Sequence, residues 1–293
     1  MRTYEFAKLD GAGNDFVMIE DMADRVSFTA EEVSRICDRH FGVGADGVIV
    51  VKPSQREECA AYMDYYNSDG TKAQMCGNGV RCFTKFIVDH GIIHPKGGAY
   101  VADTLSGPHE INYFLGMDGK VVQARVDMGE PVLEPSKVPT TLAANHRSGA
   151  AVEQTVTVGE RSFQFTCVSM GNPHAVAFVD DVAGFPLEEV GPLFETCEAF
   201  PEKANIEFAR VRGNDIEMRV WERGCGETLA CGTGSCATAV AAALTGRAER
   251  AVRVHVRGGV LGIVWGADNH VFMTGPASEN YTGSFDLDKL MAD

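Results

Sequence analysis

Two cysteines of this 293-residue chain stand in nearly the same local sequence. Each begins the pattern Cys-Gly-x-Gly, from Cys76 to Gly79 and from Cys231 to Gly234, and each pattern leads into a predicted helix. A thiol at the start of a helix lies among unpaired backbone N–H groups at the positive end of the helix dipole, which favours the thiolate. Such a cysteine can act as a base, while the flanking glycines let a substrate carboxylate approach the same N–H groups.

The surroundings of the two cysteines are also repeated along the chain. Nine residues before each cysteine, at the end of a predicted strand, stand Asn67 and Glu222. A Gly-Asn pair, containing Asn14 or Asn172, lies 62 or 59 residues before the cysteine. The order Gly-Asn, strand, nine-residue loop, Cys-Gly-x-Gly and helix therefore occurs twice, which indicates an internal duplication.

The duplication predicts a particular chemistry for the two thiols. If the halves pack about a pseudo-twofold axis, Cys76 and Cys231 face each other across one substrate carbon. Two close thiols share one proton, so one is a thiolate while the other is a thiol. Because removing a proton from one face and delivering another to the opposite face inverts a carbon, the pattern predicts racemisation or epimerisation next to a carboxylate. Backbone N–H groups would stabilise the carbanion.

Composition excludes several other classes of function. The chain carries 26 Lys and Arg against 41 Asp and Glu, a net charge of −15, so we expect no nucleic-acid partner and no anionic membrane surface. No apolar run is long enough for a membrane span, and the first 16 residues are too charged for a signal peptide. The nine cysteines are an odd number without C-x-x-C pairs, which is typical of free thiols in the cytoplasm.

Short β-rich runs separated by glycines predict a chain in which strands outnumber helices. The expected strands are Thr3–Leu9, Asp15–Glu20, Gly47–Lys52, Ala60–Tyr66, Val121–Met128, Ser162–Ser169, His174–Val179, Asn205–Arg210, Ile216–Trp221, Ala251–Val256 and Val260–Trp265. The expected helices are Thr29–His40, which opens with a Thr29/Glu32 capping box, and then Gly79–His90, Leu187–Phe194 and Gly234–Thr245. Residues 235–244 are small and uncharged on every side, so something must enclose this helix. Three prolines between Gly129 and Pro139 predict the crossing between two domains.

These motifs resemble those of the diaminopimelate epimerase family. The resemblance rests on Asn67–Thr71, Met75–Cys82, Val168–His174, Glu222–Gly234, Gly13–Phe16 and Arg39–Asp46, which span most of the chain. It implies an α+β fold of two similar β-rich domains, each a curled sheet wrapped around a central helix and related by pseudo-twofold symmetry. We expect residues 1–130, joined by 278–293, to form the first domain and residues 131–277 the second. The implied activity is conversion of LL- to meso-diaminopimelate without cofactor or metal, in lysine and peptidoglycan precursor biosynthesis, by a homodimer.

The resemblance also assigns roles to individual residues. Cys76 and Cys231 match the two catalytic cysteines, and His174 and Glu222 would tune their thiols. The residues that would bind diaminopimelate are Asn14, Asn67, Asn172, Asn205, Glu222 and Arg223, with Gly77, Asn78, Gly232 and Thr233 as backbone donors to the reacting carboxylate. This set suits a substrate with two carboxylates and two ammonium groups.

Other interpretations of the same residues remain open. The same chemistry would serve a racemase of another amino acid, such as glutamate, histidine or proline. A different class is a thiol switch or zinc protein that uses Cys76, Cys82, Cys231 and Cys236, although their spacing is longer than in most zinc knuckles. Gly42–Gly47 fits a dinucleotide fingerprint, but it follows a predicted helix and precedes a strand, which is the reverse of the required order.

Overall fold

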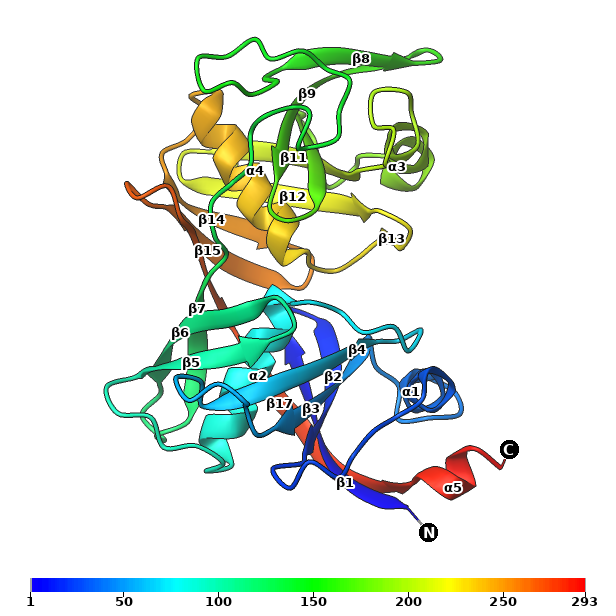
Figure 1. Ribbon diagram of the computed structural model, residues 1–293. Helices are drawn as coiled ribbons and strands as arrows, with labels where there is room; N and C mark the ends of the chain where they lie inside the picture. The colour runs from blue at the N-terminus through cyan, green and yellow to red at the C-terminus, as the bar shows by residue number, and fades with distance from the viewer. Residues whose placement is uncertain (1, 293) are drawn as a thin grey trace. The chain divides into compact units, whose positions relative to one another are not determined.

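The computed structural model describes residues 2–292, so Met1 and Asp293, at the outer ends of the expected domains, lie outside the described residues. The chain divides into two compact units, Met1–Val126 with Thr274–Asp293 and Asp127–Met273. Each unit is a mixed sheet with a long central helix (Figure 1). Within residues 2–292, no helix combines the length and apolar character needed to cross a membrane.

The first unit places its strands in the order β17-β1-β2-β3-β4-β5-β6-β7. Pairs β2–β3 and β4–β5 are parallel and the others antiparallel. The strands are β1 (Thr3–Gly11), β2 (Asn14–Glu20), β3 (Gly47–Lys52), β4 (Ala61–Asn67), β5 (Ala99–Thr104), β6 (Gly107–Leu115), β7 (Val121–Asp127) and β17 (Ser278–Asp286). The helices are α1 (Ala30–Cys37), α2 (Gly77–Asp89) and α5 (Leu287–Leu290).

The second unit repeats this arrangement. Its strands run β8-β9-β10-β11-β12-β14-β15, with β10–β11 and β12–β14 parallel. The strands are β8 (Gln154–Val158), β9 (Arg161–Ser169), β10 (Pro173–Phe178), β11 (Asn205–Arg212), β12 (Asp215–Glu222), β13 (Gly226–Glu227), β14 (Ala251–Val256) and β15 (Gly259–Trp265). The boundary between the two units falls within β16 (Val271–Pro276), after Met273. The helices are α3 (Leu187–Glu195) and α4 (Gly232–Leu244). In both units a helix connects each parallel pair, so the expected α+β architecture and its duplication are confirmed.

The two long helices are enclosed by their sheets. Gly77–Ile87 of α2 and Gly234–Ala242 of α4 are buried along their whole length. In α4 these residues are Gly, Ser, Cys, Ala, Thr and Val, whose small side chains let β9, β10, β11, β12, β14 and β15 contact the helix from several sides (Figure 1). The predicted enclosure of residues 235–244 is confirmed, and it fixes the axis of α4 against the strands.

Strands at the centre of each sheet are covered on both faces. In β2, every residue from Phe16 to Ile19 is buried. Val17 and Ile19 pack in a cluster with Val33 and Ile36 of α1, whereas their neighbours alternate toward the face that holds α2. A strand covered on two faces is apolar throughout, as parallel-paired strands usually are.

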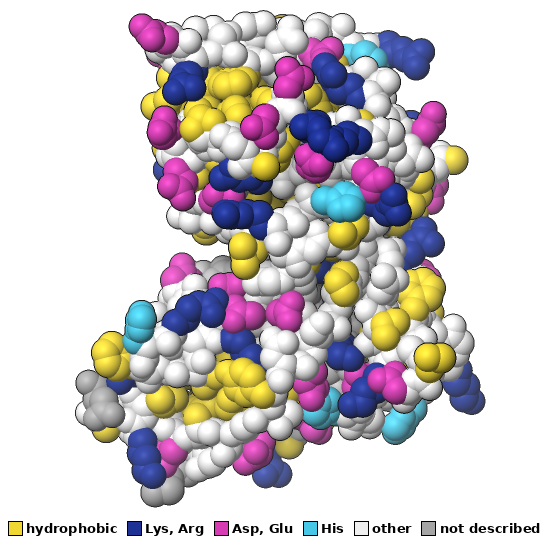
Figure 2. Space-filling view, turned by 180° about the vertical axis from the view of Figure 1, so that it is seen from behind, with side chains coloured by type: hydrophobic (Ala, Val, Ile, Leu, Met, Phe, Trp, Pro, Cys, Tyr) yellow, Lys and Arg dark blue, Asp and Glu magenta, His cyan; other side chains and the backbone are white. Residues whose placement is uncertain are grey.

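The predicted helices and strands are present in the structure, although their ends differ, and the structure also has six strands that were not predicted. The helices begin two residues earlier than expected at Gly77 and Gly232, so the cysteines themselves are the N-cap residues. The structure adds strands that sequence patterns missed, namely β5, β6, β8, β13, β16 and β17. On the face that Figure 2 shows, basic and acidic side chains are intermixed over the surface.

Thr29 tests whether local sequence directs α1. Its side chain accepts a hydrogen bond from the Glu32 N–H, and Glu32 in turn accepts from the Thr29 N–H, so the predicted capping box is present. We expect Thr29→Ala to lower the free energy of unfolding of the first unit by about 1 kcal/mol, measured by urea denaturation. Ser27→Ala, at an exposed position just before the cap, should change it by less than about 0.5 kcal/mol. Equal effects of the two variants would contradict the prediction.

Candidate active site

Cys76 and Cys231, the two candidate catalytic residues, are the N-cap residues of α2 and α4. The Cys76 Sγ accepts a hydrogen bond from the Gly79 N–H at 3.4 Å, and the Cys231 Sγ accepts from the Gly234 N–H at 3.4 Å. Both cysteines have extended backbone angles, as N-cap residues do. A sulfur in this position is the hydrogen-bond acceptor for the third residue of the helix, so a thiolate there is stabilised by the N–H group and the helix dipole.

The sheets bring the remaining candidates to the edge where these helices begin. In the first unit, β2 begins at Asn14, β3 begins at Gly47 and β4 ends at Asn67, with Phe16 opposite Gly47 and Gly47 opposite Asn67. In the second unit, β10 begins beside Asn172, β11 begins at Asn205 and β12 ends at Glu222, and these strands are likewise neighbours. The glycines before the two asparagines, Gly13 and Gly171, have φ of 83° and 91°, which only glycine adopts readily.

Asn14 contacts Cys76 directly. The Asn14 Oδ1 accepts from the Cys76 Sγ at 3.8 Å and from the Asn78 Nδ2 at 3.3 Å, while its Nδ2 donates to the Asp46 Oδ2 at 2.8 Å. Arg39 binds both Asp46 and Asp15, which fixes this acidic pair in place. Burial opposes ionisation of Asp15, but hydrogen bonds from Arg39 and Lys8 outweigh it and hold the Asp15 pKa far below its usual range.

Asn67 is the last residue of β4, and the loop that leads to Cys76 begins after it. Its Nδ2 donates to the Thr71 Oγ1 at 3.0 Å, and its backbone N–H donates to the Thr71 carbonyl at 2.9 Å. Lys72 pairs with Tyr66 across the same turn as an isolated bridge. The turn therefore holds the Asn67 amide at the strand end, half-buried.

Cys231 lies in a more acidic and more enclosed place than a surface thiol. It is 5% exposed. Burial raises the pKa of Cys231 well above that of a free thiol, and the nearby Glu222 carboxylate raises it further. The Thr233 Oγ1 lies 3.5 Å from its sulfur, and Thr228 donates to Glu222. Burial and the Glu222 charge favour the protonated form of Cys231 in the ligand-free protein.

Asn205 and Arg223 are tied to the backbone around them. The Asn205 Nδ2 donates to the Pro173 carbonyl at 2.8 Å, and its Oδ1 accepts from the Arg223 N–H at 2.9 Å. The Arg223 side chain is exposed and donates to the Glu202 carbonyl at 3.2 Å. Asn205 thus links the starts of β10 and β11 to the turn that follows β12. Because it binds the Arg223 backbone, it fixes the position from which the Arg223 side chain extends.

Two buried glutamates at this edge were missed by sequence reasoning. Glu195 at the end of α3 accepts from the Trp221 Nε1 at 2.8 Å and from the Gly224 N–H at 2.9 Å, which holds the turn carrying Arg223. Glu207 on β11 lies 2.6 Å from the His174 Nδ1, and both side chains are fully buried. Glu207 stands between Ile206 and Phe208 in a strand that also carries Asn205, Arg210 and Arg212, so the sequence gives no signal that marks it as buried.

His174 lies between Glu207 and Asn172. Its Nε2 is 3.0 Å from the Asn172 Oδ1, while its Nδ1 faces Glu207. Its two ring nitrogens are therefore both used by partners other than Cys231. The prediction that His174 tunes the thiols stays a prediction, and in this structure the ring contacts Glu207 and Asn172.

Two of the four cysteines considered as zinc ligands are not N-cap residues but lie inside the helices. Cys82 and Cys236 are fully buried within α2 and α4, and burial raises the pKa of the Cys82 thiol. They fill the space between helix and sheet as small apolar side chains do.

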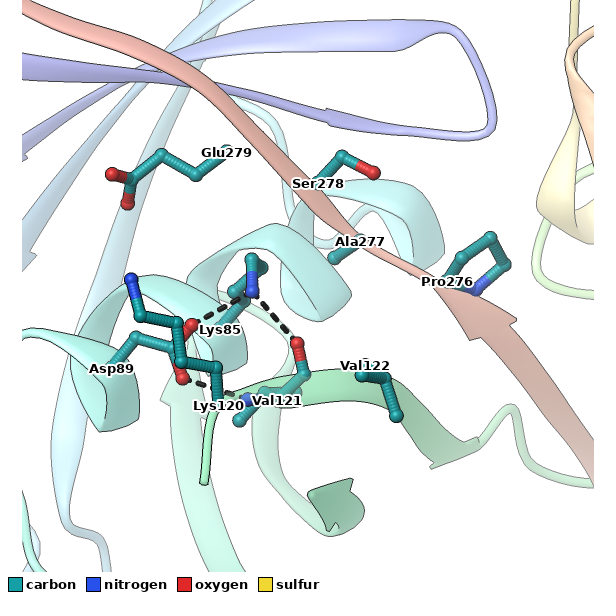
Figure 3. Close-up of a pocket in the computed structure, with 9 residues that line it drawn as sticks. All are labelled: Lys85, Asp89, Lys120, Val121, Val122, Pro276, Ala277, Ser278 and Glu279. Atoms are coloured by element: carbon teal, nitrogen blue, oxygen red, sulfur yellow. Dashed lines mark hydrogen bonds and ion pairs between the residues drawn. The ribbon is translucent and has the colours of Figure 1, made fainter. Parts of the chain in front are cut away.

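A surface pocket on the first unit lies away from these residues (Figure 3). Lys85 and Asp89 of α2 form an ion pair of 2.7 Å at its wall, and Lys85 also donates to the Val121 carbonyl at 2.7 Å. Asp89 accepts from the Val121 N–H at 2.8 Å, so the polar groups at this wall satisfy one another. Lys85 is nine residues along the helix from Cys76, roughly 14 Å, so this pocket does not include the thiol.

Comparisons with known proteins identify relatives over almost the whole chain. A family model described as diaminopimelate epimerase matches residues 6–134 and 166–279. Diaminopimelate epimerase of Leptospira biflexa is 44% identical over 283 residues, covering 96% of this chain and 99% of that protein. Diaminopimelate epimerase of Picosynechococcus sp. is 47% identical over 287 residues, covering 97% and 99%, and that of Methanococcus maripaludis is 41% identical over 286 residues, covering 97% and 100%.

Solved structures with low sequence identity share the fold. A probable proline racemase from Agrobacterium radiobacter has a TM-score of 0.71 at 13% identity, covering 97% of this chain and 93% of that chain. A PhzF-family phenazine biosynthesis protein from Bacillus anthracis has a TM-score of 0.70 at 17% identity, covering 98% and 100%. These two structures support the architecture alone.

Gly234 tests the packing around Cys231. A Cβ at Gly234 would lie 2.7 Å from the Glu207 Oε1 and 3.3 Å from the Cys231 Sγ, and both groups are buried. We expect Gly234→Ala to lower the free energy of unfolding by about 1–3 kcal/mol and to reduce activity, because the carboxylate or the thiol must shift.

The corresponding glycine of the first unit provides the matched comparison. A Cβ at Gly79 would meet the flexible ends of Ile49 and Met63 at 3.1 Å, and alanine favours the helix. Gly79→Ala should therefore change the free energy of unfolding by less than about 1 kcal/mol, measured alongside Gly234→Ala by urea denaturation. A larger loss at Gly79 than at Gly234 would refute this account.

Proposed function

Since the chain belongs to the diaminopimelate epimerase family, we propose that Cys76 and Cys231 are the base and acid with which it converts LL- to meso-diaminopimelate. The protein is an isomerase of amino-acid biosynthesis, on the route to lysine. The observation that carries the proposal is the equivalent place of the two thiols, each the N-cap of an enclosed helix at the edge of its sheet.

The proposed reaction has two proton transfers, one that removes a proton from the α-carbon and one that delivers a proton to it. A thiolate takes the proton from the α-carbon, and the electron pair of the broken C–H bond remains on carbon, delocalised into the adjacent carboxylate. The second cysteine gives its S–H proton to the opposite face of the carbon and becomes the thiolate. No electron is gained or lost by the protein, and the two cysteines exchange protonation states with each turnover.

The helix starts supply the electrostatic part of this proposal. The N–H groups of Gly77 and Asn78, and those of Gly232 and Thr233, belong to the first turns of α2 and α4, where backbone N–H groups point toward the start of the helix. They are suited to bind the reacting carboxylate as negative charge develops on it. The carbanion is then stabilised by groups that are already oriented before the proton moves.

The remaining candidates bind the rest of the substrate in this proposal. The amide side chains are those of Asn14, Asn67, Asn172 and Asn205, and the charged side chains are those of Glu222 and Arg223. Arginine and amides donate to carboxylates, while Glu222 accepts from an ammonium group. Glu222 also contributes to the raised pKa of Cys231, so a substrate ammonium that neutralises Glu222 would ease ionisation of this thiol.

We also propose that the enzyme works in the cytoplasm as a homodimer. The nine cysteines, which include the exposed Cys225, are free thiols, and thiols persist in a reducing compartment. The homodimer rests on the family resemblance.

Isotope incorporation tests the two-thiol reaction. In deuterated water, we expect both stereoisomers to gain deuterium at one α-carbon, because each proton that is delivered comes from a cysteine that exchanges with solvent. Cys76→Ala and Cys231→Ala should each abolish net inversion, measured by chiral chromatography of the product. The Cys225→Ala variant is the control for loss of an exposed thiol and should retain activity. Turnover by the Cys76→Ala, Cys231→Ala double variant would refute the proposal.

A substrate panel separates this activity from that of a racemase for another amino acid. We expect kcat/KM for LL-diaminopimelate to exceed that for glutamate, histidine or proline by at least about 100-fold, because buried polar groups that recognise the far end of diaminopimelate stay unpaired with the shorter amino acids. The measurement is stereoisomer conversion without added cofactor. A comparable rate with any of the three would reassign the substrate.

A further inference from the structure

Glu207 and His174 form a carboxylate–imidazole pair that is sealed inside the second unit. The Glu207 Oε1 lies 2.6 Å from the His174 Nδ1, and both residues have 0% exposure. They lie on the parallel neighbours β11 and β10, where Val176 is opposite Glu207 and His174 is opposite Asn205. The two-thiol reaction proposed above gives Glu207 no task.

Complete burial restricts the charge of this pair. An ionised Glu207 beside a neutral imidazole would leave a net negative charge in a site without solvent, which is costly. The groups facing Glu207 from other elements add to this cost, since Glu222 on β12 is acidic and Cys231 at α4 offers no positive charge. Burial therefore keeps one more proton on the pair and raises the pKa of Glu207.

The second carboxylate oxygen supports the same conclusion. The Glu207 Oε2 is buried and has no hydrogen-bond partner among the residues that the structure describes. Burying an oxygen without a hydrogen bond costs less free energy when it is the carbonyl oxygen of a neutral carboxylic acid than when it belongs to a charged carboxylate. The proton is thus shared between the Glu207 Oε1 and the His174 Nδ1, and the pair as a whole is neutral.

A neutral pair determines what the far side of the imidazole does. Whether the shared proton lies on Glu207 or on His174, the His174 Nε2 carries a proton of its own. This N–H donates to the Asn172 Oδ1 at 3.0 Å. An amide held by its oxygen turns its NH2 group toward the opposite side, so Asn172 becomes a hydrogen-bond donor to a ligand.

We propose that Glu207 is a positioning residue: through the proton on the His174 Nε2, it holds the Asn172 amide in the orientation that donates to a carboxylate of the substrate. This inference rests on the proposed function, in which Asn172 binds diaminopimelate. It makes His174 a fixed donor. The contrasting arrangement is a charged carboxylate that holds the Nδ1 proton and leaves the Nε2 bare as a base, as in serine-protease triads.

The protonation of the imidazole can be measured directly in the unaltered enzyme. In protein labelled with ¹⁵N at histidine, we expect the chemical shift of the His174 Nε2 to be that of a protonated nitrogen at every pH from about 6 to 9. The His174→Asn variant assigns the signal. His270 serves as the comparison, because hydrogen bonding to Asp127 raises the His270 pKa and its half-exposed ring exchanges protons with solvent. A bare Nε2 within this range would overturn the proposal.

Two substitutions of Glu207 separate a neutral donor from a required charge. Gln can donate its NH2 to the Nδ1 as the neutral acid does, so we expect Glu207→Gln to lower kcat/KM by no more than about threefold. Met has a similar size but cannot donate, so Glu207→Met should raise KM for diaminopimelate at least about tenfold, with a smaller change in kcat. A loss of about 100-fold in Glu207→Gln, or an unchanged KM in Glu207→Met, would refute the role.

A control and an independent readout complete the experiment. Asp215 pairs with His255 at 2.6 Å on the surface of the same unit, and Asp215→Asn should change kcat/KM by less than about twofold. If Glu207→Met fails to fold, Glu207→Gln and the imidazole shift still decide the proposal. If the unaltered protein does not epimerise diaminopimelate, the proposed function fails, while the shift of the His174 Nε2 still tests the buried pair.

Discussion

The structure depends on one interaction that occurs once in each unit, the hydrogen bond from a helix N–H to a cysteine sulfur. Cys76 and Cys231 take the N-cap position that serine, threonine, aspartate or asparagine usually occupies. Sulfur is a weak acceptor as a thiol and a good one as a thiolate, so the cap is stronger in the state that can remove a proton. The same bond thus fixes the start of the helix and favours the reactive form of the side chain.

The sheets and the enclosed helices serve this interaction. Because α2 and α4 are buried along their length, their first turns cannot fray without opening the core. The parallel pairs bring three strand ends to the edge where each helix begins, which places amide and carboxylate groups beside the thiol. The first unit surrounds its cysteine with Asn14 and a network that includes Arg39. The second unit surrounds its cysteine with Glu207 and Glu222, so similar backbones provide different electrostatic environments.

Sequence patterns gave the expected strands and helices at the centre of each sheet because those elements are apolar on both faces or small throughout. They missed β17, in which Phe285 is the single buried residue and pairing with β1 replaces burial as the source of stability. Motif resemblance supplied the candidate residues, and the structure shows how they are held. Glu207 could not be found from the sequence, since its partner His174 is 33 residues away and only the register of β10 and β11 brings them together.

The pairing of β17 with β1 has a consequence for biosynthesis of the chain. Thr3 lies opposite Asp286, so β1 gains its outer neighbour only from a strand that is translated after residues 127–273. Residues 127–273, by contrast, carry the helices and strands of the second unit in one continuous stretch. During translation the second unit can therefore close before β17 is made, and until then β1 has an unpaired strand edge that is open to non-native pairing.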